Sequence, residues 1–236
     1  MTALLEARGL SLGYGDLTVV WDVDLDVNAG EVVALIGSNG AGKTTLLRGL
    51  SGLIPPRGGS IRWDGAPVHG LAAWERVRRG LALCAEGRQL FNGFTVEENL
   101  RMGAYTRPAA EVSTSLAEVY ELFPELATHR RRIAGDLSGG QQQMCAIGRA
   151  LMSRPRLLMI DEMSLGLAPV AVDRLLGAIE GVHAKGVTVL LVEQDVPVAL
   201  SISQHAYVVE AGRVSLSGPS RDLMGDPHVR EAYLGL

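Results

Sequence analysis

The chain has 236 residues, of which 47% are hydrophobic and 20% are charged. This balance is enough to bury one substantial core, so it excludes an intrinsically disordered chain. The formal net charge of -4 provides no overall basic surface, and we therefore expect no nucleic acid among the main partners. Two cysteines, Cys84 and Cys145, lie far apart in apolar surroundings, and we expect both to be reduced, buried thiols.

Neither a membrane span nor a secretion signal is expected from the sequence. The most apolar runs, 32–36 and 187–192, are much shorter than the roughly 20 residues that cross a bilayer. The first residues, MTALLEARGLSL, lack the basic start and long apolar stretch of a secretory signal. We therefore expect a cytoplasmic chain in a reducing compartment.

The first third of the chain is predicted to be mostly strand. Val23, Leu25 and Val27 alternate with aspartates, which is the period-2 pattern of a strand with one face in water. Residues 32–36 are apolar throughout, as in a central strand of a covered parallel sheet. A glycine follows directly, and then a helix is predicted from about Lys43. Further short strands are expected near 60–63 and 81–85, separated by turn-rich segments.

From about 87 to 153 the apolar spacing becomes helical, which predicts an inserted helical subdomain. Thr95 and Glu98 have the spacing of a capping box at one helix start. Strands and helices alternate again afterwards, at 157–160, 170–184 and 187–192, before a hairpin at 206–216 and two short helices. This order predicts an α/β fold with a mostly parallel sheet, in which residues 1–236 form a single domain.

Residues 37–44, GSNGAGKT, match the pattern G-x-x-x-x-G-K-[ST] between a predicted buried strand and a predicted helix. Glycines allow backbone N–H groups to surround a polyphosphate, and the helix N-terminus adds partial positive charge. In this pattern Lys43 reaches the β- and γ-phosphates, and the hydroxyl of Thr44 ligates Mg²⁺. The predicted nucleotide-binding residues are Gly37, Ser38, Asn39, Gly40, Ala41, Gly42, Lys43, Thr44 and Thr45.

A pair of acidic residues, Asp161 and Glu162, ends the apolar run RLLMI. Ligands of open α/β sheets gather at the carboxyl ends of the strands. Because a buried strand tolerates acidic residues only for a reason, we expect Asp161 to hold Mg²⁺ through water. Glu162 is predicted to orient or deprotonate the attacking water.

A second anion cradle is predicted at Ser138, Gly139, Gly140 and Gln141, within the sequence LSGGQ. The serine hydroxyl can cap a helix, and the glycine N–H groups at its first turn are unobstructed. One nucleotide does not need two such cradles from the same chain.

The order of phosphate loop, LSGGQ and apolar strand with Asp-Glu resembles the ATP-binding-cassette family of ATPases along the whole chain. The resemblance implies a P-loop NTPase fold, with a RecA-like core, an N-terminal antiparallel β subdomain and the inserted helical subdomain. It also implies that LSGGQ closes over ATP held by the other subunit of a head-to-tail dimer. Tyr14, in GYGD, matches the aromatic residue that stacks on adenine in this family.

Three positions depart from the commonest pattern of the family. Glu86 stands where a glutamine usually contacts Mg²⁺, and a carboxylate can also serve as a ligand. Ala168 replaces an aspartate, which removes a polar contact across the dimer. Gln194 replaces a histidine near the γ-phosphate and cannot switch its charge by protonation. The implied metal residues are thus Thr44, Glu86 and Asp161, and the implied catalytic residues are Glu162 and Gln194.

The segments EGR, SLGLAP, VEQ and VREAYLGL are similar to one of the two ATPases of bacterial branched-chain amino acid importers, although Ala85 and Met163 replace usual prolines. The resemblance implies ATP and Mg²⁺ as cofactors and a location on the inner face of the membrane. It implies two transmembrane permeases, a second, different ATPase and a solute-binding protein as partners, with a homodimer as the alternative in isolation.

Other assignments remain open at this stage. Related importers of urea or short-chain amides share part of the pattern. The three departures are also compatible with a non-hydrolytic subunit, or with a module that binds ATP only to hold an assembly together. A soluble cassette protein acting on DNA or ribosomes usually has two cassettes or a long coiled coil, and this sequence has neither.

Overall fold

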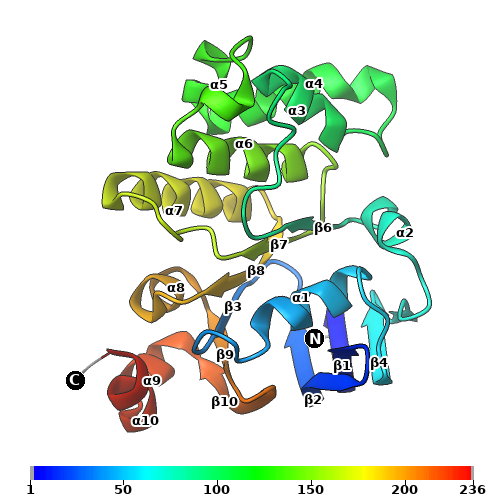
Figure 1. Cartoon of the computed structure of the whole chain (residues 1–236), viewed down its shortest axis with the longest axis vertical. Coiled ribbons are helices and arrows are strands. Elements are labelled where there is room, and N and C mark those ends of the chain that lie inside the picture. Colours follow the sequence, from blue (N-terminus) through cyan, green and yellow to red (C-terminus); the bar gives the residue numbers. More distant parts are fainter. Residues whose placement is uncertain (1–2, 235–236) are drawn as a thin grey trace.

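The computed structural model describes residues 3–234, which form two sheets and a layer of helices (Figure 1). The first sheet has four strands in the order β2-β1-β4-β5, and neighbouring strands in it pair antiparallel. Its strands are β1 (Leu5–Tyr14), β2 (Leu17–Val27), β4 (Gly58–Trp63) and β5 (Ala66–Pro67). The period-2 pattern of residues 23–27 is therefore confirmed as part of a strand.

The second sheet has six strands in the order β10-β9-β3-β8-β7-β6, and all its pairs are parallel except β9 with β10. Every residue of β3, β7 and β8 is buried, as the unbroken apolar runs predict. The strands are β3 (Val32–Ile36), β6 (Leu81–Cys84), β7 (Leu157–Asp161), β8 (Thr188–Glu193), β9 (His205–Glu210) and β10 (Arg213–Pro219). The hairpin expected near the end of the chain is β9 and β10.

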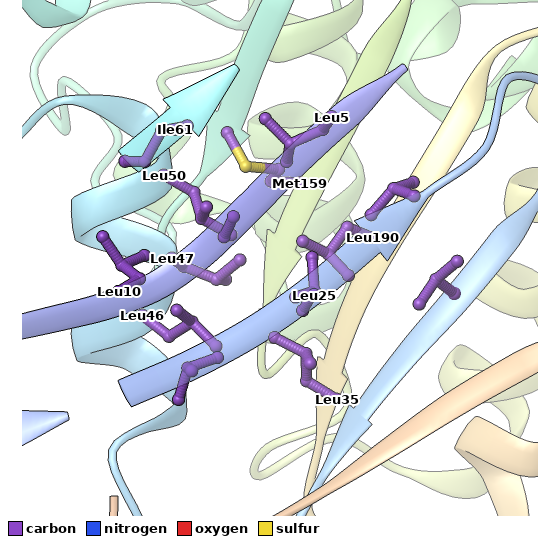
Figure 2. Packing of buried hydrophobic residues seen from close by; sticks show 14 of the residues in the cluster. Leu5, Leu10, Leu25, Leu35, Leu46, Leu47, Leu50, Ile61, Met159 and Leu190 are labelled. Carbon is purple, nitrogen blue, oxygen red and sulfur yellow. The ribbon is translucent and has the colours of Figure 1, made fainter. Parts of the chain in front are cut away.

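Helix α1 (Lys43–Ser51) packs between the two sheets. Leu46, Leu47 and Leu50 of α1 lie in one apolar cluster with residues of both sheets (Figure 2). The buried side chain of Arg76 donates to the carbonyl oxygens of Gly49 and Leu50 near the end of this helix, at 2.9 and 2.8 Å. These contacts fix α1, and with it the loop that precedes α1.

A separate layer of helices lies over the β6 and β7 side of the six-stranded sheet (Figure 1). It contains α3 (Val96–Gly103), α4 (Ala109–Leu122), α5 (Pro124–Thr128), a 3-10 turn (Ala134–Asp136) and α6 (Gly139–Leu151). The capping box of Thr95 and Glu98 is present at the start of α3. Helix α7 (Pro169–Ala184) shares a continuous apolar cluster with this layer and with the sheet.

The remaining helices are short. They are α2 (Ala73–Arg78), α8 (Val196–Ile202), α9 (Ser220–Gly225), α10 (Pro227–Val229) and a π-helical turn (Arg230–Leu234). Helices α9 and α10 are the two short helices expected at the end, whereas α2 and α8 were missed. Within residues 3–234, no helix combines the length and the apolar character needed to cross a membrane.

Candidate functional site

The loop between β3 and α1 has the backbone conformation of a phosphate cradle. Gly37, Gly40 and Gly42 have φ angles of 151°, 79° and 105°, a region that L side chains rarely adopt. A Cβ atom at Gly37 would also lie 2.2 Å from the carbonyl oxygen of Val209. Both the conformation and the close approach of β9 therefore require glycine at this position.

The ammonium group of Lys43 lies inside this loop. Lys43 is 4% exposed, and its Nζ donates to the carbonyl oxygens of Gly37 at 2.7 Å and Ser38 at 3.0 Å. Burial lowers the pKa of Lys43, while the nearby carboxylates of Glu162 and Asp161 act in the opposite direction. The loop thus holds a cation where a polyphosphate would lie.

Thr44 and Asp161 meet at the start of α1. The hydroxyl of Thr44 donates to a carboxylate oxygen of Asp161 at 3.2 Å. Asp161 is 3% exposed, and burial raises its pKa to about 6, against a smaller lowering by the Thr44 hydrogen bond. Two residues 117 positions apart therefore present adjacent oxygen atoms, the type of ligand that Mg²⁺ prefers.

Glu86 lies next to this pair. It follows β6 and lines, together with Asp161 and Arg48, a cavity of about 660 Å³. Hydroxyl and carboxylate oxygens are the ligands that Mg²⁺ prefers, and it usually takes few of them from the protein when it also binds phosphate. The oxygen donors present fit that ion, although no cluster of three or more His, Cys, Asp or Glu residues within 3–234 could hold a metal alone.

Glu162 and Gln194 follow neighbouring strands of the parallel sheet. Asp161 is paired with Val192, so the residues after these two strands emerge at the same edge. The backbone N–H of Glu162 donates to the carbonyl oxygen of Val192 at 2.9 Å, and the φ angle of Glu162 is 50°. This left-handed conformation is uncommon for a residue with a side chain and costs about 1–3 kcal/mol, a form of strain often found at active sites.

The LSGGQ segment starts helix α6, as its composition predicts. Ser138 is the N-cap residue, and its hydroxyl accepts from the backbone N–H of Gln141 at 3.3 Å while the Gln141 side chain accepts from Ser138 N–H at 3.2 Å. The first intrahelical bond is donated by Gln142. The N–H groups of Gly139 and Gly140 precede that bond, so they point out of the helix N-terminus.

The close contacts of residues 138–141 are made to the helical layer, to α7 and to the loop that carries Glu86 and Arg88, not to the phosphate loop. Cβ atoms at Gly139 and Gly140 would lie 3.0 Å from Arg88 Nη2 and 2.9 Å from Ala171 Cβ, respectively. The Gln141 side chain donates to Glu125. Helices α6 and α1 lie on opposite sides of the six-stranded sheet (Figure 1). The structure thus brings Lys43, Thr44, Glu86, Asp161 and Glu162 to one edge, with the LSGGQ segment apart from them.

Tyr14 lies at the end of β1, where its hydroxyl accepts from Arg48 of α1 at 3.1 Å. Tyr14 is 41% exposed, so part of it remains open to solvent beside α1. The contact therefore places an aromatic face at the outer side of the phosphate-loop helix.

Sequence reasoning missed two contacts between polar side chains near the site. Arg88 donates to the Gln142 side chain at 3.0 Å, which connects the Glu86 loop to α6. Glu193 is 1% exposed and accepts from the backbone N–H and the hydroxyl of Ser164, at 3.0 and 2.6 Å. For Glu193 the sequence did offer a signal. It ends the apolar run TVLLVE, just as acidic residues end the apolar run before Glu162 in MIDE.

Comparison with known proteins agrees with this geometry. Residues 20–164 match the family model described as ABC transporter. The chain is 45% identical to the high-affinity branched-chain amino acid transport ATP-binding protein BraG of Pseudomonas aeruginosa, over 98% of this chain and 100% of that protein. It is 35% identical to the probable branched-chain amino acid transport ATP-binding protein LivF of Archaeoglobus fulgidus, over 99% of each.

Other transporter ATPases are also similar. The lipopolysaccharide export system ATP-binding protein LptB of Escherichia coli K12 is 33% identical, over 99% of this chain and 98% of that protein. A solved structure of the ADP conformation of MJ1267, an ATP-binding cassette of an ABC transporter, superposes with a TM-score of 0.88 at 26% identity, over 100% of both chains. The predicted P-loop NTPase fold class is thus confirmed. The chain belongs to the ABC transporter family and is one of its ATP-hydrolysing, ATP-binding subunits.

Proposed function

We propose that the chain is the second ATPase subunit of a membrane importer for branched-chain, hydrophobic amino acids. The single observation that carries this proposal is the 45% identity to BraG, which extends over 98% of the chain. The variant motifs EGR, SLGLAP and VEQ support the same assignment. In this proposal the protein is cytoplasmic and bound peripherally to the inner face of the membrane.

The proposed site uses the residues at the edge of the parallel sheet. The loop 37–45 binds the phosphates of ATP, and Tyr14 stacks on adenine. Thr44 and Glu86 would ligate Mg²⁺, and Asp161 would hold it through water. The ion supplies positive charge to the β- and γ-phosphates when bound. Ser138, Gly139, Gly140 and Gln141 contact the γ-phosphate of ATP in the other subunit of the dimer.

Glu162 and Gln194 have the catalytic roles in this proposal. The Glu162 carboxylate accepts a hydrogen bond from the attacking water and takes its proton as the bond to phosphorus forms. Gln194 lies at the end of the neighbouring strand, from which its amide group donates to an oxygen of the γ-phosphate. Water oxygen forms the new bond, and the bond between phosphorus and the β,γ-bridging oxygen breaks.

The proposed partners are two transmembrane permeases, a second, non-identical ATPase and a solute-binding protein. A groove of about 410 Å³ supports permease docking. It lies between the Glu86 loop and the helical layer and includes Phe91, Met102, Tyr105 and Arg149. Tyr105 is 62% exposed, and such an open apolar side chain suits a contact with a permease helix.

The test begins with gentle purification of the tagged chain from detergent-solubilised native membranes, followed by mass spectrometry. Recovery of two permeases and a different ATPase is expected. ATP hydrolysis by that complex is then compared with hydrolysis by a Glu162→Gln complex, which should bind ATP but release almost no phosphate. Near-normal phosphate release by Glu162→Gln would disprove the proposed role of Glu162, and recovery with ribosomes or DNA would disprove the transport role.

The second candidate function is that of an ATPase subunit in an export system. The 33% identity to LptB, which covers 99% of this chain, favours it. The same purification separates the candidates. Copurification of a solute-binding protein, and stimulation of hydrolysis by that protein loaded with a branched-chain amino acid, support import. Stimulation by a lipopolysaccharide, with no response to amino acids, would support export.

A further inference from the structure

A buried carboxylate lies beside the proposed catalytic residues without belonging to them. Glu193 is the last residue of β8, directly before Gln194, and it is 1% exposed. One of its oxygens accepts from the backbone N–H of Ser164 at 3.0 Å, and the other accepts from the Ser164 hydroxyl at 2.6 Å. Burying a charged carboxylate is costly unless hydrogen bonds compensate it. Both oxygens are compensated here by the same residue.

Ser164 belongs to the loop that follows Glu162. Two fixed points therefore enclose the strained backbone of Glu162. On one side its own N–H donates to the carbonyl oxygen of Val192, and two residues later the Glu193 carboxylate holds Ser164. Between them, Met163 is 1% exposed and so is fixed by packing. A residue with φ of 50° persists only where its surroundings determine it, and the Glu193 contact is part of those surroundings.

The same carboxylate is connected to Gln194 through the chain. Glu193 and Gln194 are adjacent at the end of β8, so a shift of Glu193 moves the backbone from which the Gln194 amide extends. Glu193 therefore connects the loop that carries Glu162 with the residue proposed to contact the γ-phosphate. Ser164 and Glu193 lie 29 positions apart in sequence, and their two segments are otherwise joined by the ladder of β7 and β8.

We propose that Glu193 is a positioning residue for ATP hydrolysis, which holds Ser164 and thereby orients Glu162 and Gln194 relative to the γ-phosphate. This inference rests on the proposed role of Glu162. Glu193 is not a second general base, because it is buried and both of its oxygens are occupied by Ser164. It acts only through the positions of other groups.

Three variants of the full chain, assayed in the assembled complex, test this role. Glu193→Leu removes both hydrogen bonds at similar volume, and kcat should fall on the order of 100-fold, as expected for a misplaced catalytic group. KM for ATP should change by less than about threefold, because the phosphate loop is untouched. Glu193→Gln should retain most of the activity, since its amide oxygen can accept from Ser164 N–H while its NH2 group donates to the Ser164 hydroxyl.

The third variant, Ser164→Ala, removes one of the two bonds and should lower kcat less than Glu193→Leu. Combined with Glu193→Leu it should add nothing, because both changes break the same contact. Additive losses would contradict the proposed contact. Glu210→Gln, at the end of β9, serves as the matched control and should leave kcat unchanged.

The outcomes separate this inference from the proposed function. If the wild-type complex releases no phosphate, or if Glu162→Gln remains active, the proposed function itself fails. If those two behave as expected but Glu193→Leu keeps normal kcat, or raises KM with kcat unchanged, the positioning role alone is wrong. If the melting temperature shows that Glu193→Leu folds poorly, the other two variants decide. Normal kcat in Ser164→Ala together with a loss of kcat in Glu193→Gln would overturn the positioning role.

Discussion

The hydroxyl of Thr44 lies 3.2 Å from a carboxylate oxygen of Asp161, so the first turn of α1 meets the carboxyl end of β7 at one hydrogen bond. Thr44→Val removes this hydroxyl at nearly constant volume. Losing a charge-assisted hydrogen bond and a metal ligand should weaken ATP binding in Mg²⁺ by about 10–100-fold. Titration with a fluorescent ATP analogue measures the change. In EDTA the variant and the wild type should bind equally, and an equal loss in EDTA would contradict the metal role.

Lys43→Ala should lower ATP affinity whether or not Mg²⁺ is present. The Lys43 ammonium lies inside the loop at 4% exposure, so its replacement removes a desolvated positive charge from the phosphate site. The expected loss is about 10–100-fold in Kd for a charged hydrogen-bond donor. Lys185→Ala is the matched control, because Lys185 lies beyond the end of α7 and contacts Glu121. Unchanged affinity in Lys43→Ala would refute the phosphate contact.

Gly139→Ala should impair hydrolysis without reducing ATP binding to the chain that carries the change. Its Cβ would lie 3.0 Å from Arg88 Nη2 and 3.3 Å from a methyl group of Leu167, so one of these neighbours must move. The resulting shift of the α6 N-terminus should lower kcat on the order of 10–100-fold. Gly177→Ala in α7 is a suitable control, since its Cβ has no neighbour within 4 Å. Normal kcat in Gly139→Ala would show that this surface is not used.

Contiguous motifs were the part of the site that the sequence could predict. The phosphate loop and the capped start of α6 depend on residues within eight positions of one another, and their local backbone chemistry fixes their structure. The position of Asp161 and Glu162 at the edge of the sheet was predicted because ligands of parallel sheets bind at the carboxyl ends of the strands. Each of these predictions needed only the order of the elements, not the packing of side chains.

Contacts between distant segments could not be predicted in this way. The Glu193 and Ser164 bond depends on the register of β7 and β8, and the Arg88 and Gln142 bond crosses 54 positions. Helix α2 was missed because its six residues give little periodicity and its N-cap residue, Ala72, has no polar side chain. Helix α8 had a readable signal, because Asp195 caps it and a proline occupies its first turn.

The end of the chain should respond to pH through His228 and Glu210. His228 Nε2 lies 2.9 Å from a Glu210 oxygen. This hydrogen bond raises the pKa of His228 above its ordinary value and lowers the pKa of Glu210 below its ordinary value. The stabilisation from His228 is fully present below its ordinary pKa and is lost as pH rises through the raised value. The melting temperature of His228→Gln should therefore fall further below that of the wild type at pH 6 than at pH 8.5. An equal difference at both pH values would contradict the ion pair.

Ala168→Asp should stabilise the chain, because α7 begins without a side-chain cap. Ala168 is the N-cap residue of α7, and no side-chain hydrogen bond closes that end. An aspartate there can accept from the first-turn N–H groups, which is worth about 0.5–2 kcal/mol. A gain of 1 kcal/mol corresponds to a rise of about 2–4 °C in melting temperature for a domain of this size.

The same substitution restores the aspartate usual in the family, so its effects on folding and on activity can be separated. A cap acts within one chain, and the melting temperature of the isolated protein should rise whether or not it dimerises. If the restored carboxylate also forms a contact across the dimer, hydrolysis should rise as well, but only in the assembled complex. Ala168→Glu is the control, because it places the same charge at the same position on a side chain that is not a preferred N-cap. A melting temperature that rises as much in Ala168→Glu as in Ala168→Asp would rule out capping as the cause.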